Sequence, residues 1–111
     1  MSHLPERENL HVEERKVTKY LLNLEHEIGG PKAVFFLKRG FTPEHWEVLA
    51  QAIREHGATQ QVTEEEETPR GRKYEVQCQL VSPDGKNPCI LSVWIKEGTK
   101  PLRLVTAHPN S

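Results

Sequence analysis

The chain lacks the sequence features that identify secreted disulfide-rich proteins and membrane proteins. Its two cysteines, Cys78 and Cys89, are too few for the disulfide framework of a small secreted domain. No apolar run approaches the roughly 18–20 residues of a membrane-spanning helix, so we expect no membrane partner. The first residues also lack the apolar stretch of a signal peptide. These absences together predict a cytoplasmic protein.

Neither sign of charge is in excess. Fifteen basic and sixteen acidic residues give a formal net charge of −1. The chain therefore lacks the bulk positive charge of a nonspecific nucleic-acid binder, although a local basic patch is compatible with this balance. A length of 111 residues is enough for one domain that folds without stabilising disulfides or metal ions.

The sequence also lacks the local motifs of most enzyme classes. It has no phosphate-cradling Walker loop and no dinucleotide-binding fingerprint. Its six histidines never occur at metal-ligand spacing, and no Cys-x-x-Cys or His-Glu-x-x-His arrangement exists. We therefore expect no cofactor and no metal.

Apolar residues recur every three or four positions in the first half, which indicates helices. A first helix is predicted over residues 12–23, and a second over residues 31–39. Pro31 suits the start of the second helix, and Gly40 suits its end. The apolar stripe of the first helix consists of Val17, Tyr20, Leu21 and Leu24.

A third predicted helix begins at Thr42-Pro43, where Thr42 is a suitable N-cap, and ends near Gly57. Residues 1–11 are polar and without periodicity, so we expect a flexible lead-in. A single α+β domain over residues 12–109 would then follow.

After Gly57 the apolar residues alternate, which indicates strands. The clear predictions are strands over residues 71–81, 89–95 and 102–107. Residues 59–63 are ambiguous, and the four glutamates that follow fit either an exposed edge strand or a loop. The expected fold is α+β, with three N-terminal helices packed on one face of a C-terminal antiparallel sheet of three to four strands.

The turn at residues 82–86, Ser-Pro-Asp-Gly-Lys, decides which residues share a sheet face. A three-residue loop would place Tyr74 on the face of Trp94, and a four-residue loop would place it on the face of Ile95. We adopt the four-residue loop over residues 83–86, because it gathers the more apolar set on the face that the helices cover.

The other face would then be open to solvent. In this register it displays Lys73, Glu75, Gln77, Ile90, Ser92 and Trp94. Arg103 joins it if Leu102 and Leu104 point inward. A tryptophan beside cationic and amide side chains is suited to stacking on a base and to holding an anion. The same register places Cys78 and Cys89 diagonally, roughly 7–8 Å apart, which predicts reduced thiols.

Two basic groups could bind phosphate. His26 and Lys32 flank the Gly-Gly-Pro break, and a helix start attracts phosphate, although an ordinary surface loop is the favoured explanation. Arg70, Arg72 and Lys73 form a basic cluster, but the preceding glutamates could simply pair with it.

Acid–base chemistry without a metal is the remaining possibility. RNA is cleaved by its own 2′-OH when a base removes that proton, an acid protonates the leaving oxygen and a cation stabilises the phosphate. The candidate catalytic residues are His26, Lys32, Lys73, Arg103, Thr106 and His108. Arg103 and His108 have opposite parity in a regular strand, so they converge only if the strand bends or bulges.

Several segments resemble a family of small bacterial proteins catalogued as a domain of unknown function. The matching segments include Lys19-Tyr20-Leu21-Leu22-Asn23, His26 with Gly29, Lys32-Ala33, Phe35-Phe36, Pro83-Asp84-Gly85, Val93-Trp94 and Arg103-Leu104-Val105-Thr106-Ala107-His108-Pro109. The resemblance spans about residues 13–109 and implies a stand-alone protein or a module of larger toxin-like proteins.

The layout is similar to that of the barnase, EndoU and RelE-like ribonucleases, in which nucleic acid lies on the open sheet face. This similarity implies a metal-independent endoribonuclease of toxin type, with the six candidate residues above as its catalytic set. Arg70, Arg72 and Trp94 are then the expected substrate-binding residues. The alternative is a non-catalytic interaction module, so the expected partner is either RNA or a cognate protein.

Overall fold

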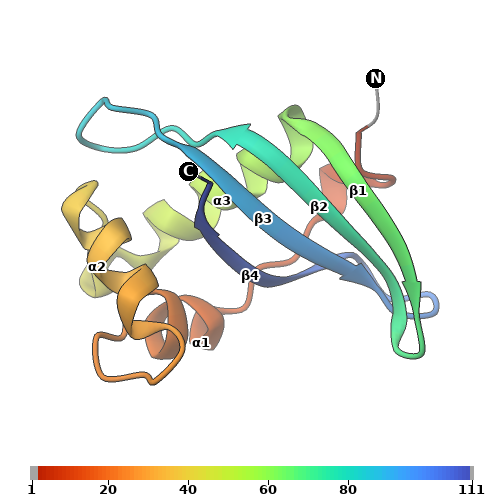
Figure 1. Ribbon diagram of the computed structural model, residues 1–111, viewed down its shortest axis with the longest axis horizontal. Coiled ribbons are helices and arrows are strands. Elements are labelled where there is room, and N and C mark those ends of the chain that lie inside the picture. Colours follow the sequence, from red (N-terminus) through yellow and green to blue (C-terminus); the bar gives the residue numbers. More distant parts are fainter. Residues whose placement is uncertain (1–2, 111) are drawn as a thin grey trace.

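Helical segments precede four strands in a computed structural model that describes residues 3–110 (Figure 1). The helical segments are η1 (Arg7–Asn9), α1 (Glu14–Lys16), η2 (Val17–Leu21), α2 (Gly30–Lys38), η3 (Pro43–His45) and α3 (Trp46–Thr59). The strands are β1 (Gln61–Thr68), β2 (Gly71–Gln79), β3 (Cys89–Lys96) and β4 (Arg103–Pro109). All four form one antiparallel sheet in the order β1-β2-β3-β4, which confirms the predicted α+β class.

The first predicted helix is shorter than its apolar stripe indicated. α1 continues directly into η2, a π-helical turn, and Leu24 lies beyond it with 59% of its surface exposed. Val17 and Leu21 are fully buried, as the stripe predicted. α2 has proline in its first turn, and Gly40 follows it with a φ of 100°, a conformation that glycine adopts at low cost.

α3 begins and ends later than predicted, because residues 43–45 form the separate 3₁₀ turn η3. It runs past Gly57 to Thr59, and the side chain of Thr42 makes no capping hydrogen bond. A Cβ atom on Gly57 would lie 2.7 Å from Cζ2 of Trp94. Gly57 therefore serves close packing between α3 and the sheet rather than helix termination.

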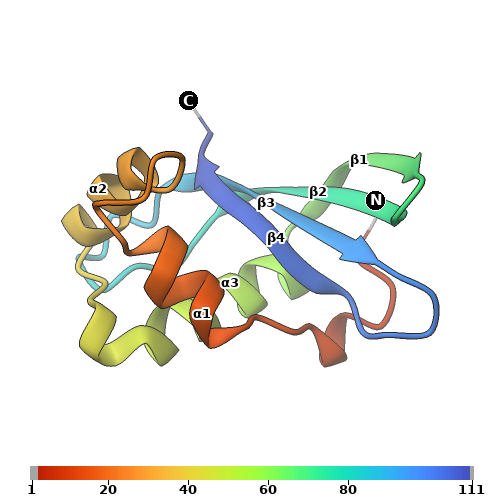
Figure 2. The ribbon, with the colours of Figure 1, turned by 90° about the horizontal axis from the view of Figure 1, so that it is seen from below.

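α3 crosses one face of the sheet, and α1 lies beside it on the same side (Figure 2). The core between these layers contains the inward side chains of β2, β3 and β4. It includes Tyr74, Val76, Ile90, Trp94, Leu104 and Ala107 from the sheet, and Leu49, Ile53 and His56 from α3.

The predicted register of β2 and β3 is wrong by one residue. Tyr74 pairs with Trp94, so the two side chains share the face that α3 covers. The register differs because the connection between β2 and β3, residues 80–88, is a longer loop rather than a tight turn. Ser82, Asp84 and Asn87 hydrogen-bond to one another within this loop and fix its shape.

The slip exchanges the two faces of β3, whereas the residues of β2 keep their predicted faces. Trp94, expected on the open face, is 0% exposed, and Ile90 and Ser92 are buried with it. The sheet face opposite α3, which we call the open face, carries Lys73, Glu75, Arg103, Thr106 and His108, together with Val93 and Ile95, which are buried.

The cysteines are also placed differently from the prediction. Cys78 and Cys89 form a disulfide, with their Cα atoms 4.4 Å apart. The observed register brings the two residues closer than the predicted diagonal arrangement, which makes the bond sterically accessible. The disulfide joins β2 to β3 at the base of the 80–88 loop.

The segment before α1 is tied to the rest of the protein. Leu4 and Leu10, in the region expected to be a flexible lead-in, are 3% and 8% exposed and contribute to the core. The His11 amide donates to the Leu102 carbonyl at 2.8 Å, and the Leu104 amide donates to the His11 carbonyl at 3.0 Å. These bonds hold the approach to α1 against the start of β4. Within residues 3–110, every helix is too short or too polar to span a bilayer.

Candidate functional site

A bulge in β4 places three candidate residues on the open face. Leu104 pairs with Trp94, whereas Thr106 pairs with Val93, so Val105 is an extra residue in the ladder. Arg103 precedes this bulge, while Thr106 and His108 follow it. All three side chains therefore point away from α3, and the convergence that a regular strand would prevent becomes possible.

Tyr20, Lys32 and Thr106 meet at the β4 edge of this face. Nζ of Lys32 donates to the Tyr20 hydroxyl at 2.5 Å and to Oγ1 of Thr106 at 3.2 Å. The Tyr20 hydroxyl and Oγ1 of Thr106 are themselves 3.0 Å apart and hydrogen-bonded. We call these three side chains the Lys32 triangle. It joins η2, the first turn of α2 and β4, which are far apart in the sequence.

Glycine makes the approach of α2 to η2 possible. A Cβ atom on Gly29 would lie 2.8 Å from Cδ1 of Tyr20 and still closer to the backbone of Tyr20. The amide of Gly30 donates to the His26 carbonyl at 2.8 Å. The Gly-Gly-Pro break thus turns the chain tightly enough for Lys32 to reach Tyr20.

The Lys32 triangle changes the acidity of Tyr20. Burial raises the pKa of the phenol, but the hydrogen bonds from Lys32 and Thr106 and the charges of Lys32 and Lys16 outweigh it. The net effect is a pKa below the ordinary value of 10.0. Tyr20 is therefore a stronger proton donor than an ordinary tyrosine.

His26 lies against Tyr20 with a defined tautomer. The two ring centroids are 4.9 Å apart in an edge-to-face arrangement. Nδ1 of His26 accepts hydrogen bonds from the backbone amides of Ile28 at 3.1 Å and Gly29 at 3.0 Å. Because Nδ1 is an acceptor, the ring proton of neutral His26 resides on Nε2, which is a donor.

His108 has the opposite tautomer. Its Nδ1 lies 3.1 Å from the Pro109 carbonyl oxygen, which can only accept a hydrogen bond. The proton of the neutral ring is therefore on Nδ1, and Nε2 carries the lone pair of a base. His108 projects from the same face of β4 as Thr106, about 7 Å further along the strand.

A positively charged cavity of about 460 Å³ lies beside the Lys32 triangle. It is lined by Glu13, Arg15, Lys16, Lys19, Tyr20, His26 and Arg103. Nε of Arg103 donates to Glu97 at 2.8 Å, and this bond, together with the charge of Arg103, holds the pKa of Glu97 below its usual range. Four cations against one carboxylate in the lining make this cavity suited to a phosphate.

The basic residues of β2 and its turn do not join this group. Arg72 pairs with Glu65 at 2.9 Å and Glu67 at 2.8 Å, and Arg70 lies 4.0 Å from Glu97. Lys73 lies 3.8 Å from Glu66, in a small cavity lined otherwise by glutamates. Arg72 and Lys73 thus pair with the preceding glutamates, as the local-pairing interpretation predicted, whereas Arg70 lies next to Glu97 instead.

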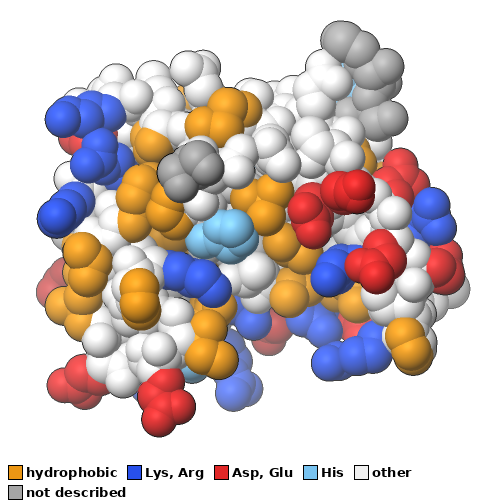
Figure 3. Space-filling view, viewed as in Figure 1, with side chains coloured by type: hydrophobic (Ala, Val, Ile, Leu, Met, Phe, Trp, Pro, Cys, Tyr) orange, Lys and Arg blue, Asp and Glu red, His pale blue; other side chains and the backbone are white. Residues whose placement is uncertain are grey.

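Figure 3 shows the resulting division of the open face. Histidine and Lys or Arg side chains lie near its middle, next to α2, whereas Asp and Glu side chains, with Lys or Arg between them, lie toward the β1–β2 end.

Trp94 cannot stack on a base, because it belongs to a buried polar network instead. Its Nε1 donates to Oγ of Ser92 at 2.9 Å, and Oγ lies 2.9 Å from Nδ1 of His56. Nε2 of His56 donates to the Cys78 carbonyl at 2.9 Å, so in the neutral ring Nδ1 accepts a hydrogen bond from the Ser92 hydroxyl. Burial lowers the pKa of His56 to about 4, although its backbone hydrogen bonds oppose this shift.

The structure thus gathers His26, Lys32, Arg103 and Thr106 around Tyr20 and leaves Lys73, Arg70, Arg72 and Trp94 outside this group. His108 lies on the same sheet face, two residues beyond Thr106. Tyr20 was missed because it occupied an apolar helical stripe. It is the one member of that stripe with a polar tip, and this was the available signal. Across residues 3–110, no three His, Cys, Asp or Glu side chains are grouped so as to hold a metal ion.

Comparisons with known proteins give a family and a related fold. A family model described as "Domain of unknown function (DUF6883)" matches residues 3–111. No curated protein matches the chain. A chain from the solved "Contact-dependent growth inhibition toxin - immunity protein complex from Klebsiella pneumoniae 342" is similar, with a TM-score of 0.74 and 14% identity. The match covers 89% of this chain and 98% of that chain, and at this identity it shows a common fold.

Proposed function

We propose that this chain, which belongs to the DUF6883 family of domains of unknown function, is a metal-independent endoribonuclease of toxin type. The observation that carries the proposal is the Lys32 triangle at the edge of a cationic cavity, with His108 on the same sheet face. The related fold in a toxin–immunity complex supports the toxin context.

The proposed reaction is attack of an RNA 2′-OH on the adjacent phosphorus. The bond from phosphorus to O2′ forms and the bond to O5′ breaks, which leaves a 2′,3′-cyclic phosphate and a 5′-OH. This reaction needs one base, one acid and stabilisation of charge on the phosphate oxygens. No water is consumed, and the proton lost at O2′ is balanced by the proton gained at O5′.

The tautomer of His108 and the lowered pKa of Tyr20 suggest which residue is the base and which is the acid. Nε2 of His108 accepts the 2′-OH proton, since its Nδ1 already donates to Pro109. Tyr20 protonates the leaving O5′, because the hydrogen bonds and charge around it lower its pKa. The Lys32 ammonium then stabilises the phenolate that forms.

The remaining groups stabilise the phosphate. Lys32 and Arg103 supply positive charge, and Nε2 of His26 and the Thr106 hydroxyl supply hydrogen-bond donors. Lys73 has no part in this scheme, because its neighbours are Glu66 and other glutamates.

Cleavage of a 5′-labelled single-stranded RNA in the presence of a chelator tests the proposal. We expect fragments that end in a 2′,3′-cyclic phosphate. Lys32→Met should lower kcat by about 10²–10³-fold, the usual effect of removing one transition-state donor. Lys38→Met, on the exposed side of the same helix, is the matched control and should cleave like the parent protein.

Two results would contradict the proposal. One is RNA that stays intact at high protein concentration while circular dichroism shows a folded protein. The other is equal activity of Lys32→Met and Lys38→Met. A 2′-O-methyl RNA of the same sequence must remain uncut, because the nucleophile is blocked.

The second candidate function is a non-catalytic interaction module. It is favoured by the origin of the similar chain, which comes from a complex of a toxin with its immunity protein. A stable one-to-one complex with a host protein, together with inactivity toward RNA, would support this function over the first.

A further inference from the structure

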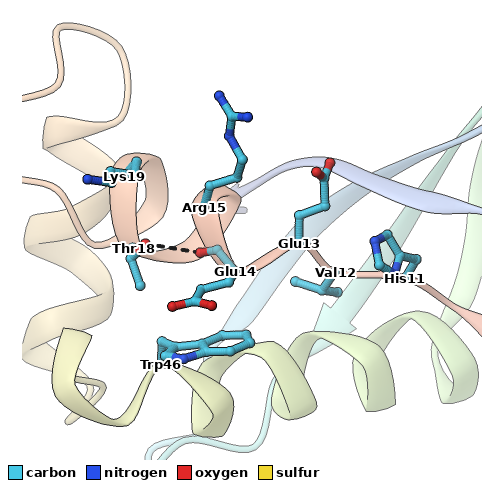
Figure 4. Close-up of a pocket in the computed structure, with 8 residues that line it drawn as sticks. All are labelled: His11, Val12, Glu13, Glu14, Arg15, Thr18, Lys19 and Trp46. Atoms are coloured by element: carbon cyan, nitrogen blue, oxygen red, sulfur yellow. Dashed lines mark hydrogen bonds between the residues drawn. The ribbon is translucent and has the colours of Figure 1, made fainter.

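A second cavity, of about 520 Å³, opens between the α1 region and the start of α3 (Figure 4). Trp46, the first residue of α3, lies along one side of it, below Val12 and Glu14. The indole is half-buried and packs on the hydrophobic core, so its orientation is fixed while part of its surface faces the cavity.

This cavity adjoins the cavity beside the Lys32 triangle. Glu13, Arg15 and Lys19 line both. In Figure 4 the side chains of Arg15 and Lys19 extend away from Trp46. A group bound by these two cations would therefore lie in the cavity beside the Lys32 triangle, next to the Trp46 cavity.

The two cavities differ in charge. The lining of the Trp46 cavity has two cations and two carboxylates, those of Glu13 and Glu14, so its charges cancel. The other lining has an excess of cations. A phosphate is favoured in the charged cavity, and a flat, uncharged aromatic group is favoured against Trp46.

From this arrangement we infer that Trp46 is the stacking platform for the base of a nucleotide that flanks the cleaved bond. Arg15 and Lys19 hold the phosphate that joins this nucleotide to the reacting one. The inference rests on the proposed function and deepens it, because it makes the substrate a single strand of several nucleotides. A duplex is excluded, since its bases are not available for stacking on a side chain.

The test is binding of an uncleavable 2′-O-methyl hexanucleotide, followed by tryptophan fluorescence. Trp94 is fully buried, so quenching reports on Trp46. We expect saturable quenching in the parent protein. Trp46→Leu should weaken binding about tenfold, which corresponds to the lower end of the 1–3 kcal/mol range for one stacked base. Anisotropy of a labelled strand measures affinity in this variant.

Trp46→Phe should restore most of the affinity, since phenylalanine also stacks on bases. Replacement of Arg15 and Lys19 by Gln should reduce the salt dependence, with the slope falling by about 0.7 for each lost phosphate contact. Lys38→Gln is the control for a lysine outside the cavity. The charge variants test the subsite even if Trp46→Leu fails to fold.

Equal affinity of Trp46→Leu and the parent protein would overturn the inference, as would the absence of any quenching. The proposed function fails differently. If native RNA stays intact while the stacking signal and its loss in Trp46→Leu are observed, the subsite holds and the catalytic proposal falls. If RNA is cleaved but Trp46→Leu binds normally, only the subsite falls.

Discussion

Tyr20 and His56 are both titratable, but their surroundings favour proton donation by Tyr20 and a structural role for His56. Tyr20 is half-buried and receives a hydrogen bond from Lys32, so its pKa falls and its proton becomes available. His56 is 2% exposed, and both ring nitrogens are occupied by Ser92 and the Cys78 carbonyl. Burial favours its neutral form, which makes it a structural residue that links α3 to the sheet.

Stability should therefore depend on the protonation of His56. Its pKa is about 4 in the folded protein and 6.5 for an ordinary histidine, so between these values the unfolded chain binds the additional proton. The contribution to the free energy of unfolding is fully present above 6.5 and is lost as the pH falls to about 4. The total loss is roughly 3 kcal/mol.

Urea denaturation at a series of pH values measures this effect. His56→Gln is less stable at neutral pH, but its stability should vary less with pH in this window. Parallel curves for the two proteins would show that another group is responsible. Glu97, whose folded pKa is lowered, loses its contribution at lower pH in both proteins alike.

At the scale of secondary-structure elements, α3 and β4 owe their positions to single-residue features. α3 lies close to the sheet because Gly57 presents no side chain to Trp94. β4 presents Arg103 and Thr106 on one face because the bulge at Val105 changes the parity of the strand. Gly57 thus permits close packing in the core, and the bulge at Val105 places the side chains of the candidate site on one face.

Gly57→Ala should destabilise the protein although alanine is the better helix former. The gain in helix propensity is about 1 kcal/mol. The new Cβ would lie 2.7 Å from Cζ2 of Trp94 and 2.9 Å from Cδ1 of Leu10, both in the packed core. Overpacking of this kind costs about 1–3 kcal/mol, so we expect a net loss of stability.

Thermal or chemical unfolding of Gly57→Ala measures the loss. In a Trp94→Phe background, where the nearest ring atom is missing, the same change should cost less. A Gly57→Ala protein that is more stable than the parent would show that the helix and sheet separate without penalty.

For the whole molecule, the net charge is close to zero, but the cationic and acidic side chains are concentrated at different ends. The formal charge is −1, yet cations surround the cavity beside the Lys32 triangle and glutamates cover β1. Glu64 and Glu66 pair with Glu75 and Lys73, so they share the open face with the site. If the protein acts on RNA as we propose, these acidic groups would repel a phosphate backbone from one end of that face and confine it to the other.

Replacing Glu64 and Glu66 together by Gln should therefore tighten RNA binding a few-fold at low salt. The effect should vanish near 1 M salt, where the screening length is about 3 Å. Replacing Glu44 and Glu55, two exposed residues of the η3–α3 segment, by Gln is a control with the same change in net charge. An equal gain in both proteins would mean that net charge, rather than its position, governs binding.

The sequence by itself determined the class of the fold and most of the candidate site. The change from helical to alternating periodicity predicted the helices and strands, because the spacing of apolar residues in each segment reflects which side of that segment is buried. His26, Lys32, Arg103, Thr106 and His108 were recognisable from their chemistry. Only the tertiary structure decided the register, the burial of Trp94, the Cys78–Cys89 disulfide and the role of Tyr20. Register depends on the path of a loop and on packing between layers, and a one-residue difference exchanges the two faces of a strand.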